Sequence, residues 1–196
     1  MNKKVAHLRD QILEAMLPNV PLTGWTMETA RDACASIKVD AEQIAVLFPD
    51  GLMDIVAHFS DYCDQMMLRE LEHIDSHDMR IRDRIQTATE TRFQILVPHR
   101  DAVRLALAYW SVPPRTLRAS QIVWRTADRI WDWAGDTSSD YNRYTKRGLL
   151  SGILTATTLV WIKDFSSDMS VTRTFLSHRI EHALQFGQML GKFKRP

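Results

Sequence analysis

Cysteine and long apolar runs are scarce in this sequence. The two cysteines, Cys34 and Cys63, cannot form a disulfide framework, and both fall in helix-like patterns, which predicts buried free thiols. No segment approaches the ~18 apolar residues that a membrane-spanning helix needs. The N-terminal stretch carries Asp10 and Glu14 and lacks an apolar segment, so it resembles neither a signal peptide nor a transit peptide. These absences predict a chain that works in the cytosol.

An excess of charge of one sign is also absent. The 196 residues carry a formal net charge of +1, which leaves no overall electrostatic footprint for nucleic acid. No glycine-rich phosphate-binding motif occurs, and no G-x-S-x-G sequence frames a serine nucleophile. Neither cysteine has the basic neighbours that activate a thiol. We therefore predict no catalytic residues, no metal site and no cofactor.

Apolar residues recur at helical spacing along most of the chain, without the alternation typical of a strand. This pattern predicts an all-α protein with about nine helices. We expect Thr26 and Asp40 to cap two short helices and the Pro113-Pro114 pair to interrupt the chain. Residues 1–50 are expected to form one region and residues 51–196 a helical bundle. The other expected helices cover residues 3–17, 50–74, 79–96, 98–111, 116–134, 139–163 and 170–191.

The first three expected helices have the spacing of a helix-turn-helix. They resemble the TetR family of regulators, including the Phe48-Pro49 pair that closes the second short helix. The charges oppose DNA binding, because residues 24–50 hold two basic and five acidic side chains, a net charge of −3. The would-be recognition helix carries carboxylates and aliphatic groups where phosphates and base edges require cations and amides. We expect no nucleic-acid binding. The alternative, a TetR-like regulator with an atypical head, predicts salt-sensitive binding to duplex DNA.

The segment of residues 127–147 concentrates bulky apolar side chains around a tight polar corner, and a Lys-Arg pair follows on the next expected helix. Side chains of this kind form either core or an exposed anchor for a partner protein. Their density, with aromatic rings beside charged groups, favours a partner-binding patch. The residues of this expected patch are Ile130, Trp131, Trp133 and Tyr144.

Two histidine motifs match metal-binding patterns only in part. His178, Glu181 and His182 form an H-x-x-E-H sequence, whose two imidazoles share one helix face. No acidic residue follows His182 to act as the third ligand. The Glu70-Leu-Glu-His73 sequence lacks the further carboxylates and second motif that a di-iron bundle requires. A metal hydrolase is therefore the disfavoured interpretation.

Two further features concern assembly. Gly148, Gly152 and Ala156 recur every four residues along one expected helix, so this small-residue stripe either packs within the chain or forms a homodimer seam. Residues 171–196 carry five basic side chains and one acidic side chain beside an apolar stripe. This segment is either a solvated basic tail or a contact with an anionic membrane surface.

The chain is similar to a known family from about residue 24 to residue 180. The similarity rests on longer motifs that occur in a fixed order. With them the chain resembles the coenzyme Q (ubiquinone) biosynthesis accessory family, the ninth Coq protein. The motifs are Met79-Arg-Ile-Arg-Asp-Arg-Ile85, Trp131-x-x-Ala-Gly-Asp-x-Ser-x-Asp140, Tyr144-Thr-Lys-Arg147, Asp164-x-Ser-x-Asp168 and Thr174-Phe-Leu-x-x-Arg-Ile180.

The resemblance implies a TetR-like fold, a homodimer and binding of lipids such as an isoprenoid quinone or a phospholipid. It also implies a non-catalytic role, in which the protein presents quinone intermediates from the membrane to the di-iron demethoxyubiquinone hydroxylase. The family's docking patch maps to Ile130, Trp133, Arg143 and Tyr144, with Arg143 where relatives often carry an aromatic residue. We expect a bacterial, cytoplasmic protein bound peripherally to the inner membrane, or a protein on the mitochondrial matrix side if the source is eukaryotic.

A helical bundle of this kind can open an apolar pocket between its long helices. For each candidate wall of that pocket, plain core packing is the favoured interpretation. The candidate walls are Leu107, Trp110, Val123, Trp124, Ala127 and Leu154.

Overall fold

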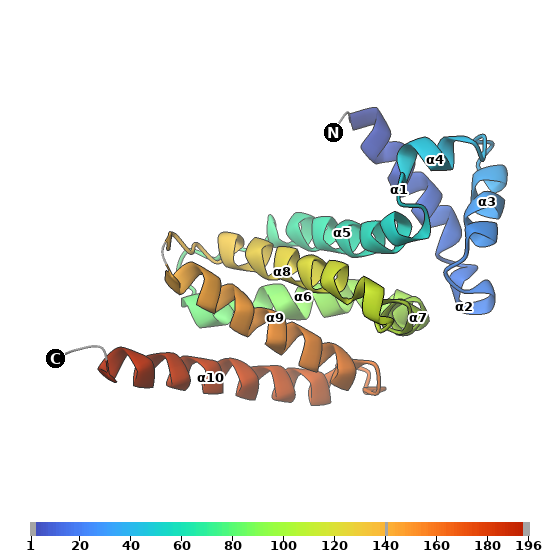
Figure 1. The fold of residues 1–196 in the computed structure, drawn as a ribbon. Helices are drawn as coiled ribbons and strands as arrows, with labels where there is room; N and C mark the ends of the chain where they lie inside the picture. Colours follow the sequence, from blue (N-terminus) through green and yellow to red (C-terminus); the bar gives the residue numbers. More distant parts are fainter. Residues whose placement is uncertain (1–2, 140, 194–196) are drawn as a thin grey trace. The chain divides into compact units, whose positions relative to one another are not determined.

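The computed structural model describes residues 3–139 and 141–193 as helices joined by short connections (Figure 1). These residues form ten α-helices and two single-turn 3-10 helices, and no strand occurs among them, which confirms the all-α prediction. The elements are α1 (Lys3–Met16), α2 (Val20–Thr23), α3 (Met27–Ser36), α4 (Gln43–Leu47), α5 (Leu52–Leu71), α6 (Ile81–Leu96), η1 (Val97–His99), α7 (Arg100–Trp110), η2 (Pro113–Arg115), α8 (Thr116–Trp133), α9 (Tyr141–Trp161) and α10 (Ser170–Phe193).

The chain divides into two compact units. The first comprises Met1–Met66 and Ile95–Ile122, and the second comprises Met67–Gln94 and Val123–Pro196. The divisions fall inside α5, α6 and α8, so these three helices contribute residues to both units. The expected division at residue 50, between a degenerate helix-turn-helix region and one compact helical bundle, stays a prediction.

In the first unit, the expected helix-turn-helix has a closed core. Thr26 caps α3 as predicted, because its hydroxyl accepts a hydrogen bond from the Thr29 N–H at 3.1 Å. The buried Trp25 ring lies 5.2 Å from the Phe59 ring, and its indole N–H donates to the Ala102 carbonyl at 2.9 Å. These contacts tie the turn before α3 to α5 and α7.

The second short helix begins later than expected. α4 starts at Gln43, and the Asp40 carboxylate accepts a hydrogen bond from the Glu42 N–H at 2.9 Å in a local turn. The prediction that Asp40 caps this helix is therefore wrong. The exposed side chains of this region include Glu42 and Val46, so a carboxylate and an aliphatic group face outward.

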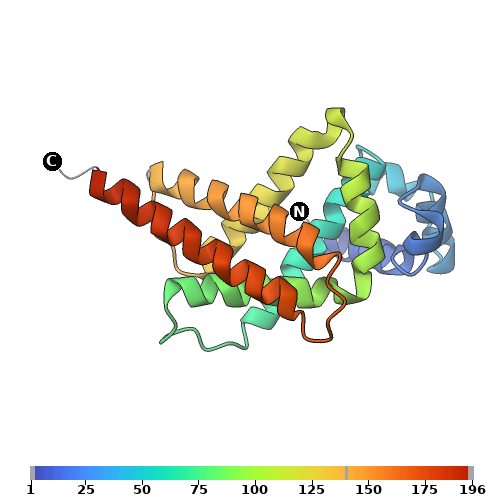
Figure 2. The ribbon, with the colours of Figure 1, turned by 90° about the horizontal axis from the view of Figure 1, so that it is seen from below.

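In the second unit, α9 and α10 run side by side in both views (Figures 1 and 2). Trp161 is fully buried at the end of α9, and its ring lies 5.6 Å from the ring of Phe93 on α6. The corner that follows is closed by Asp164, whose carboxylate accepts from the Thr172 N–H at 2.8 Å and the Thr172 hydroxyl at 2.6 Å. This contact fixes the first turn of α10.

Two further expectations concern the cysteines and membrane-spanning helices. Cys34 and Cys63 are both buried and free of disulfides, which confirms the prediction of buried free thiols. Over the ranges that the structure describes, no helix combines the length and the apolar character needed to cross a membrane.

Candidate functional site

A buried arginine holds the corner between α8 and α9. The Arg147 side chain is only 1% exposed and meets three carboxylates. Its Nε donates to Asp128, its Nη2 to Asp132 at 2.9 Å, and its Nη1 to Asp136 at 2.9 Å. Burial lowers the pKa of the guanidinium, but the hydrogen bonds to Asp128 and Asp136 outweigh burial and raise it. The corner is therefore built on a permanent positive charge.

Asp136 is the central acceptor of this corner, with a side chain 4% exposed. It accepts hydrogen bonds from the Ser138 hydroxyl at 2.7 Å, from Lys146 Nζ at 2.7 Å and from Arg147 Nη1 at 2.9 Å. Burial raises the pKa of Asp136, but the hydrogen bonds from Lys146, Ser138 and Arg147 together lower it below its usual range. The carboxylate is consequently ionised at neutral pH.

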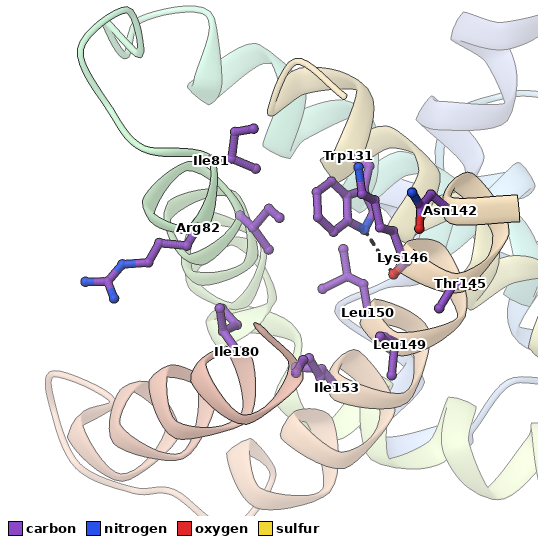
Figure 3. Close-up of a pocket in the computed structure, with 12 residues that line it drawn as sticks. Ile81, Arg82, Trp131, Asn142, Thr145, Lys146, Leu149, Leu150, Ile153 and Ile180 are labelled. Atoms are coloured by element: carbon purple, nitrogen blue, oxygen red, sulfur yellow. Dashed lines mark hydrogen bonds between the residues drawn. The ribbon is translucent and has the colours of Figure 1, made fainter. Parts of the chain in front are cut away.

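Lys146 connects this corner to the neighbouring indole ring. Its side chain is 37% exposed, and its ammonium group lies 5.3 Å from the centroid of the Trp131 ring. The Trp131 indole N–H donates to the backbone carbonyl of Lys146 at 3.1 Å, the dashed line in Figure 3. Because its polar edge is satisfied, the indole can serve as an apolar wall.

A cavity of about 460 Å³ lies beside Trp131, within the second unit (Figure 3). Its polar lining includes Asn142, Thr145 and Lys146 from the first turns of α9, whereas Arg82 points away from the other side chains in Figure 3. The volume falls in the ~300–1,000 Å³ range of small-molecule sites. The lining residues are Ile81, Arg82, Ile85, Trp131, Asn142, Thr145, Lys146, Leu149, Leu150, Ile153, Ile180 and Ala183.

The expected partner patch is exposed in part. Tyr144 is 63% exposed, and its ring centroid lies 6.3 Å from that of Trp124. Trp133 and Arg143 are half-buried, and Arg143 pairs with Asp128 at 2.9 Å. These three expected patch residues remain available to a partner, and their role in docking stays a prediction.

Two other residues of the expected patch are buried. Ile130 is fully buried, so its inclusion in an exposed patch is wrong. The physical reason is helical spacing, since Ile130 shares an inward-facing stripe with the buried Ala127 and Ala134. Trp131 is 9% exposed and faces the cavity instead of open solvent.

None of the six candidate pocket walls lines this cavity, and their role in lipid binding stays a prediction. Helical periodicity shows which side chains face inward, but it does not show where facing side chains leave space unfilled. The observed walls Leu149, Ile153 and Ile180 follow ordinary core spacing and carry no separate sequence signal. The candidate walls lie in the core or in half-buried positions: Leu107 and Trp110 in the first unit, and Val123, Trp124, Ala127 and Leu154 in the second.

The small-residue stripe on α9 lies partly at the surface. Gly148 and Gly152 are exposed, and Ala156 is half-buried. A Cβ added at Gly148 would lie 3.8 Å from the Trp124 ring, whereas one added at Gly152 would meet no described heavy atom within 4 Å. The stripe is therefore open at Gly152, and a homodimer seam there stays a prediction.

The histidine motif and the basic segment both fall on α10. His178 and His182 are exposed, and the described residues contain no group of three His, Cys, Asp or Glu side chains placed to hold a metal ion. Lys194 and Arg195, which supply part of the predicted basic charge, lie outside the described residues. Membrane contact by this segment stays a prediction.

Comparison with known proteins identifies sequence relatives over most of the chain. The COQ9 family model matches residues 117–187. The mitochondrial ubiquinone biosynthesis protein COQ9 of Homo sapiens is 29% identical over 194 residues, covering 95% of this chain and 61% of the relative. The Xenopus tropicalis protein of the same name is 30% identical over 187 residues, covering 92% of this chain and 59% of the relative. The chain thus spans about three fifths of the length of these relatives.

Comparison with solved structures identifies the fold. The crystal structure of a TetR transcriptional regulator from Nitrosomonas europaea superposes with a TM-score of 0.71 at 20% identity, covering 91% of this chain and 98% of that one. The TetR-like, all-helical fold expected from the helix spacing is therefore confirmed. The COQ9 matches likewise confirm that the chain resembles the COQ9 family, as its ordered motifs predicted.

Proposed function

We propose that this protein is a non-catalytic, lipid-binding accessory protein of ubiquinone biosynthesis. Its ligand is an isoprenoid quinone intermediate, or a phospholipid that occupies the same site. It presents the quinone to the demethoxyubiquinone hydroxylase, the di-iron enzyme that modifies the ring. The names of the COQ9 relatives support the pathway, and the cavity beside Trp131 is the observation that supports the ligand class.

The cavity suits a lipid because its walls are mostly aliphatic and its polar lining is concentrated at one end of α9. Burying apolar ligand surface is worth roughly 0.8 kcal/mol per CH₂ group. Ile85 and Leu150 form its buried walls, and Leu149 and Ile153 widen it along α9. An isoprenoid segment would bury apolar surface against all four side chains, and it would not require a specific hydrogen bond along its length.

Organic extraction and mass spectrometry of the purified protein test this ligand class. We expect a co-purified isoprenoid or phospholipid, and we expect Ile153→Trp to reduce its amount by filling the cavity. Leu159→Trp is the matched control, because Leu159 is exposed on the same helix and does not line the cavity. A lipid-free wild-type protein, or equal lipid in both variants, would contradict the proposal.

The docking of the hydroxylase is proposed at Trp133, Arg143 and Tyr144, with Tyr144 as the most exposed anchor. We expect Tyr144→Ala and Trp133→Lys to reduce co-purification with the hydroxylase while the helical content stays unchanged. Phe165→Ala is the control, since Phe165 is also an exposed aromatic residue but belongs to the next corner. Unchanged co-purification in both patch variants would refute this site.

The assembly and location are further parts of the proposal. A homodimer through the α9 stripe predicts that Gly152→Leu lowers the mass measured by light scattering to that of one chain, while Gly152→Ala leaves the dimer intact. Peripheral contact of the basic C-terminal segment with an anionic membrane predicts salt-sensitive sedimentation with anionic vesicles. In a bacterium the location is the cytoplasmic side of the inner membrane, and in a eukaryote it is the matrix side of the mitochondrial membrane.

A further inference from the structure

Lys146 differs from the other cations near the cavity. The guanidinium of Arg147 is buried and engaged by Asp128, Asp132 and Asp136. Arg82 points away from the other side chains that line the cavity (Figure 3). Lys146 lines the cavity, is partly exposed and carries its charge on a flexible four-carbon stem. It is thus the cation best placed to meet a ligand in this cavity.

The Lys146 ammonium has hydrogen-bonding capacity left for a ligand. It has three N–H donors, and two of its acceptors are Asp136 at 2.7 Å and the Ser138 hydroxyl at 3.3 Å. If the ammonium leaves Asp136 and turns toward the cavity, Asp136 keeps its hydrogen bonds from Arg147 and Ser138. Movement of Lys146 therefore leaves no buried carboxylate without a partner, which is the main cost of breaking such a pair.

The surroundings of Lys146 give the cavity a polar end. Asn142 and Thr145 line the cavity within one turn of Lys146 on α9, and the Trp131 ring forms the adjacent wall. Apart from Arg82, the remaining walls, which include Ile85, Leu150 and Ile153, are aliphatic. A ligand that matches this arrangement has one compact polar head and an apolar body.

We propose that Lys146 selects amphiphiles whose head carries an anionic oxygen, by binding that oxygen at the polar end of the cavity. A carboxylate, a phenolate and a phosphate head all fit, since each offers a negatively charged oxygen acceptor to the ammonium group. The inference rests on the lipid-binding function proposed above and adds the residue that discriminates between heads. Lys146 acts here by binding and orienting the ligand.

Three ligands with the same apolar chain test the inference: dodecanoate, dodecyl phosphate and dodecanol. Their affinities for the delipidated full chain are measured by equilibrium dialysis below the micellar concentration. We expect at least one anion to bind about tenfold or more tightly than the alcohol, the scale of a hydrogen bond to a charged group. Whichever of dodecanoate and dodecyl phosphate binds more tightly then shows whether the preferred head group is carboxylate-like or phosphate-like.

The variant Lys146→Met is expected to bring the affinities of both anions to within about twofold of the affinity of dodecanol. Lys163→Met is the matched control, because Lys163 is exposed after α9 and does not line the cavity. Lys146→Arg should retain the preference for anions, and it keeps the test decisive if Lys146→Met does not fold.

The outcomes separate this inference from the proposed function. If wild type binds all three ligands equally, or if Lys146→Met keeps the full preference for anions, the role of Lys146 is refuted and lipid binding stands. If wild type binds none of the three ligands, both proposals are overturned. Loss of the anion preference in Lys146→Arg as well as Lys146→Met would also contradict selection by charge.

Discussion

The corner between α8 and α9 and the corner between α9 and α10 share one motif, an aspartate followed two residues later by a serine. In each corner the serine hydroxyl donates to the aspartate, Ser138 to Asp136 and Ser166 to Asp164. The remaining donors differ. Asp164 receives the N–H and hydroxyl of Thr172, which are neutral, whereas Asp136 receives the side chains of two cations of α9.

This difference separates a structural corner from one that can also serve a ligand. The two donors of Thr172 to Asp164 belong to the first turn of α10, so that corner functions as a helix cap. The α8–α9 corner is an ion cluster, and its two cations differ in burial: Arg147 is sealed, while Lys146 is partly exposed and borders the cavity. A buried charge fixes the geometry, and an exposed charge beside it remains free to exchange partners.

The largest predicted effect on stability comes from replacing the buried cation, Arg147. Arg147→Met should lower the free energy of unfolding by about 3–5 kcal/mol, because three carboxylates lose a common buried partner and one of them, Asp136, is itself buried. Urea denaturation followed by circular dichroism measures this loss. Lys146→Met should cost less than about 1 kcal/mol, since its side chain is partly solvated and Asp136 keeps Arg147. Equal losses of unfolding free energy in the two variants would show that Arg147 and Lys146 contribute equally to the stability of the corner.

The second prediction concerns pH and the α9–α10 corner. Burial raises the pKa of Asp164, but hydrogen bonds from Ser166 and Thr172 outweigh burial and lower it to about 2. Because the folded pKa lies below the unfolded value of about 3.9, the contribution to stability is complete above pH ~4 and is lost as the pH falls toward 2. The loss is about 2–3 kcal/mol.

Asp164→Asn tests that assignment through the pH dependence of urea denaturation between about pH 4 and pH 2. The variant should show a shallower decline in stability than wild type, because one titrating carboxyl has been removed. Asp101→Asn is a matched control, since Asp101 is an exposed carboxylate of the first unit. The same slope in wild type and Asp164→Asn would show that this corner does not titrate during acid unfolding.

The third prediction compares the backbone of the two corners. Among the residues that the structure describes, each corner contains one with positive φ, Gly135 at 86° in the first and Met169 at 55° in the second. Gly135→Ala should cost about 1–2 kcal/mol, because an L side chain is strained there and its Cβ would lie 3.2 Å from Arg84 Nη1. Met169→Gly relieves the backbone but removes a buried side chain, so it should not stabilise the protein. Thermal denaturation of both variants measures these effects.

The sequence predicted the helices better than the site. Apolar spacing and Thr26 located every described α-helix except the four-residue α2 to within a few residues, because both signals are local. The ion cluster had a readable signal, since Asp128, Asp132 and Asp136 recur every four residues opposite a Lys-Arg pair. The cavity had none, because Ile153 has the same periodic signature whether it faces a neighbour or an empty space.

The smallest predicted effect comes from the two serines. Ser166→Ala removes a hydroxyl that donates to Asp164 and accepts from the Ser170 N–H at 3.0 Å, so it should cost about 1 kcal/mol. Ser138→Ala should cost a few tenths of a kcal/mol, because Asp136 keeps two cationic donors.

Paired urea titrations of the two serine variants compare the corners directly, since the same atom is deleted from the same motif. A larger loss in Ser138→Ala than in Ser166→Ala would mean that the Asp136 cluster depends on Ser138 to hold its geometry. Lys146 could then not leave Asp136 without weakening the corner. The proposal that its ammonium group moves from Asp136 to a ligand at little cost would be contradicted. The expected order, with Ser166 the more costly, instead supports a corner whose rigidity comes from Arg147 and leaves Lys146 free to move.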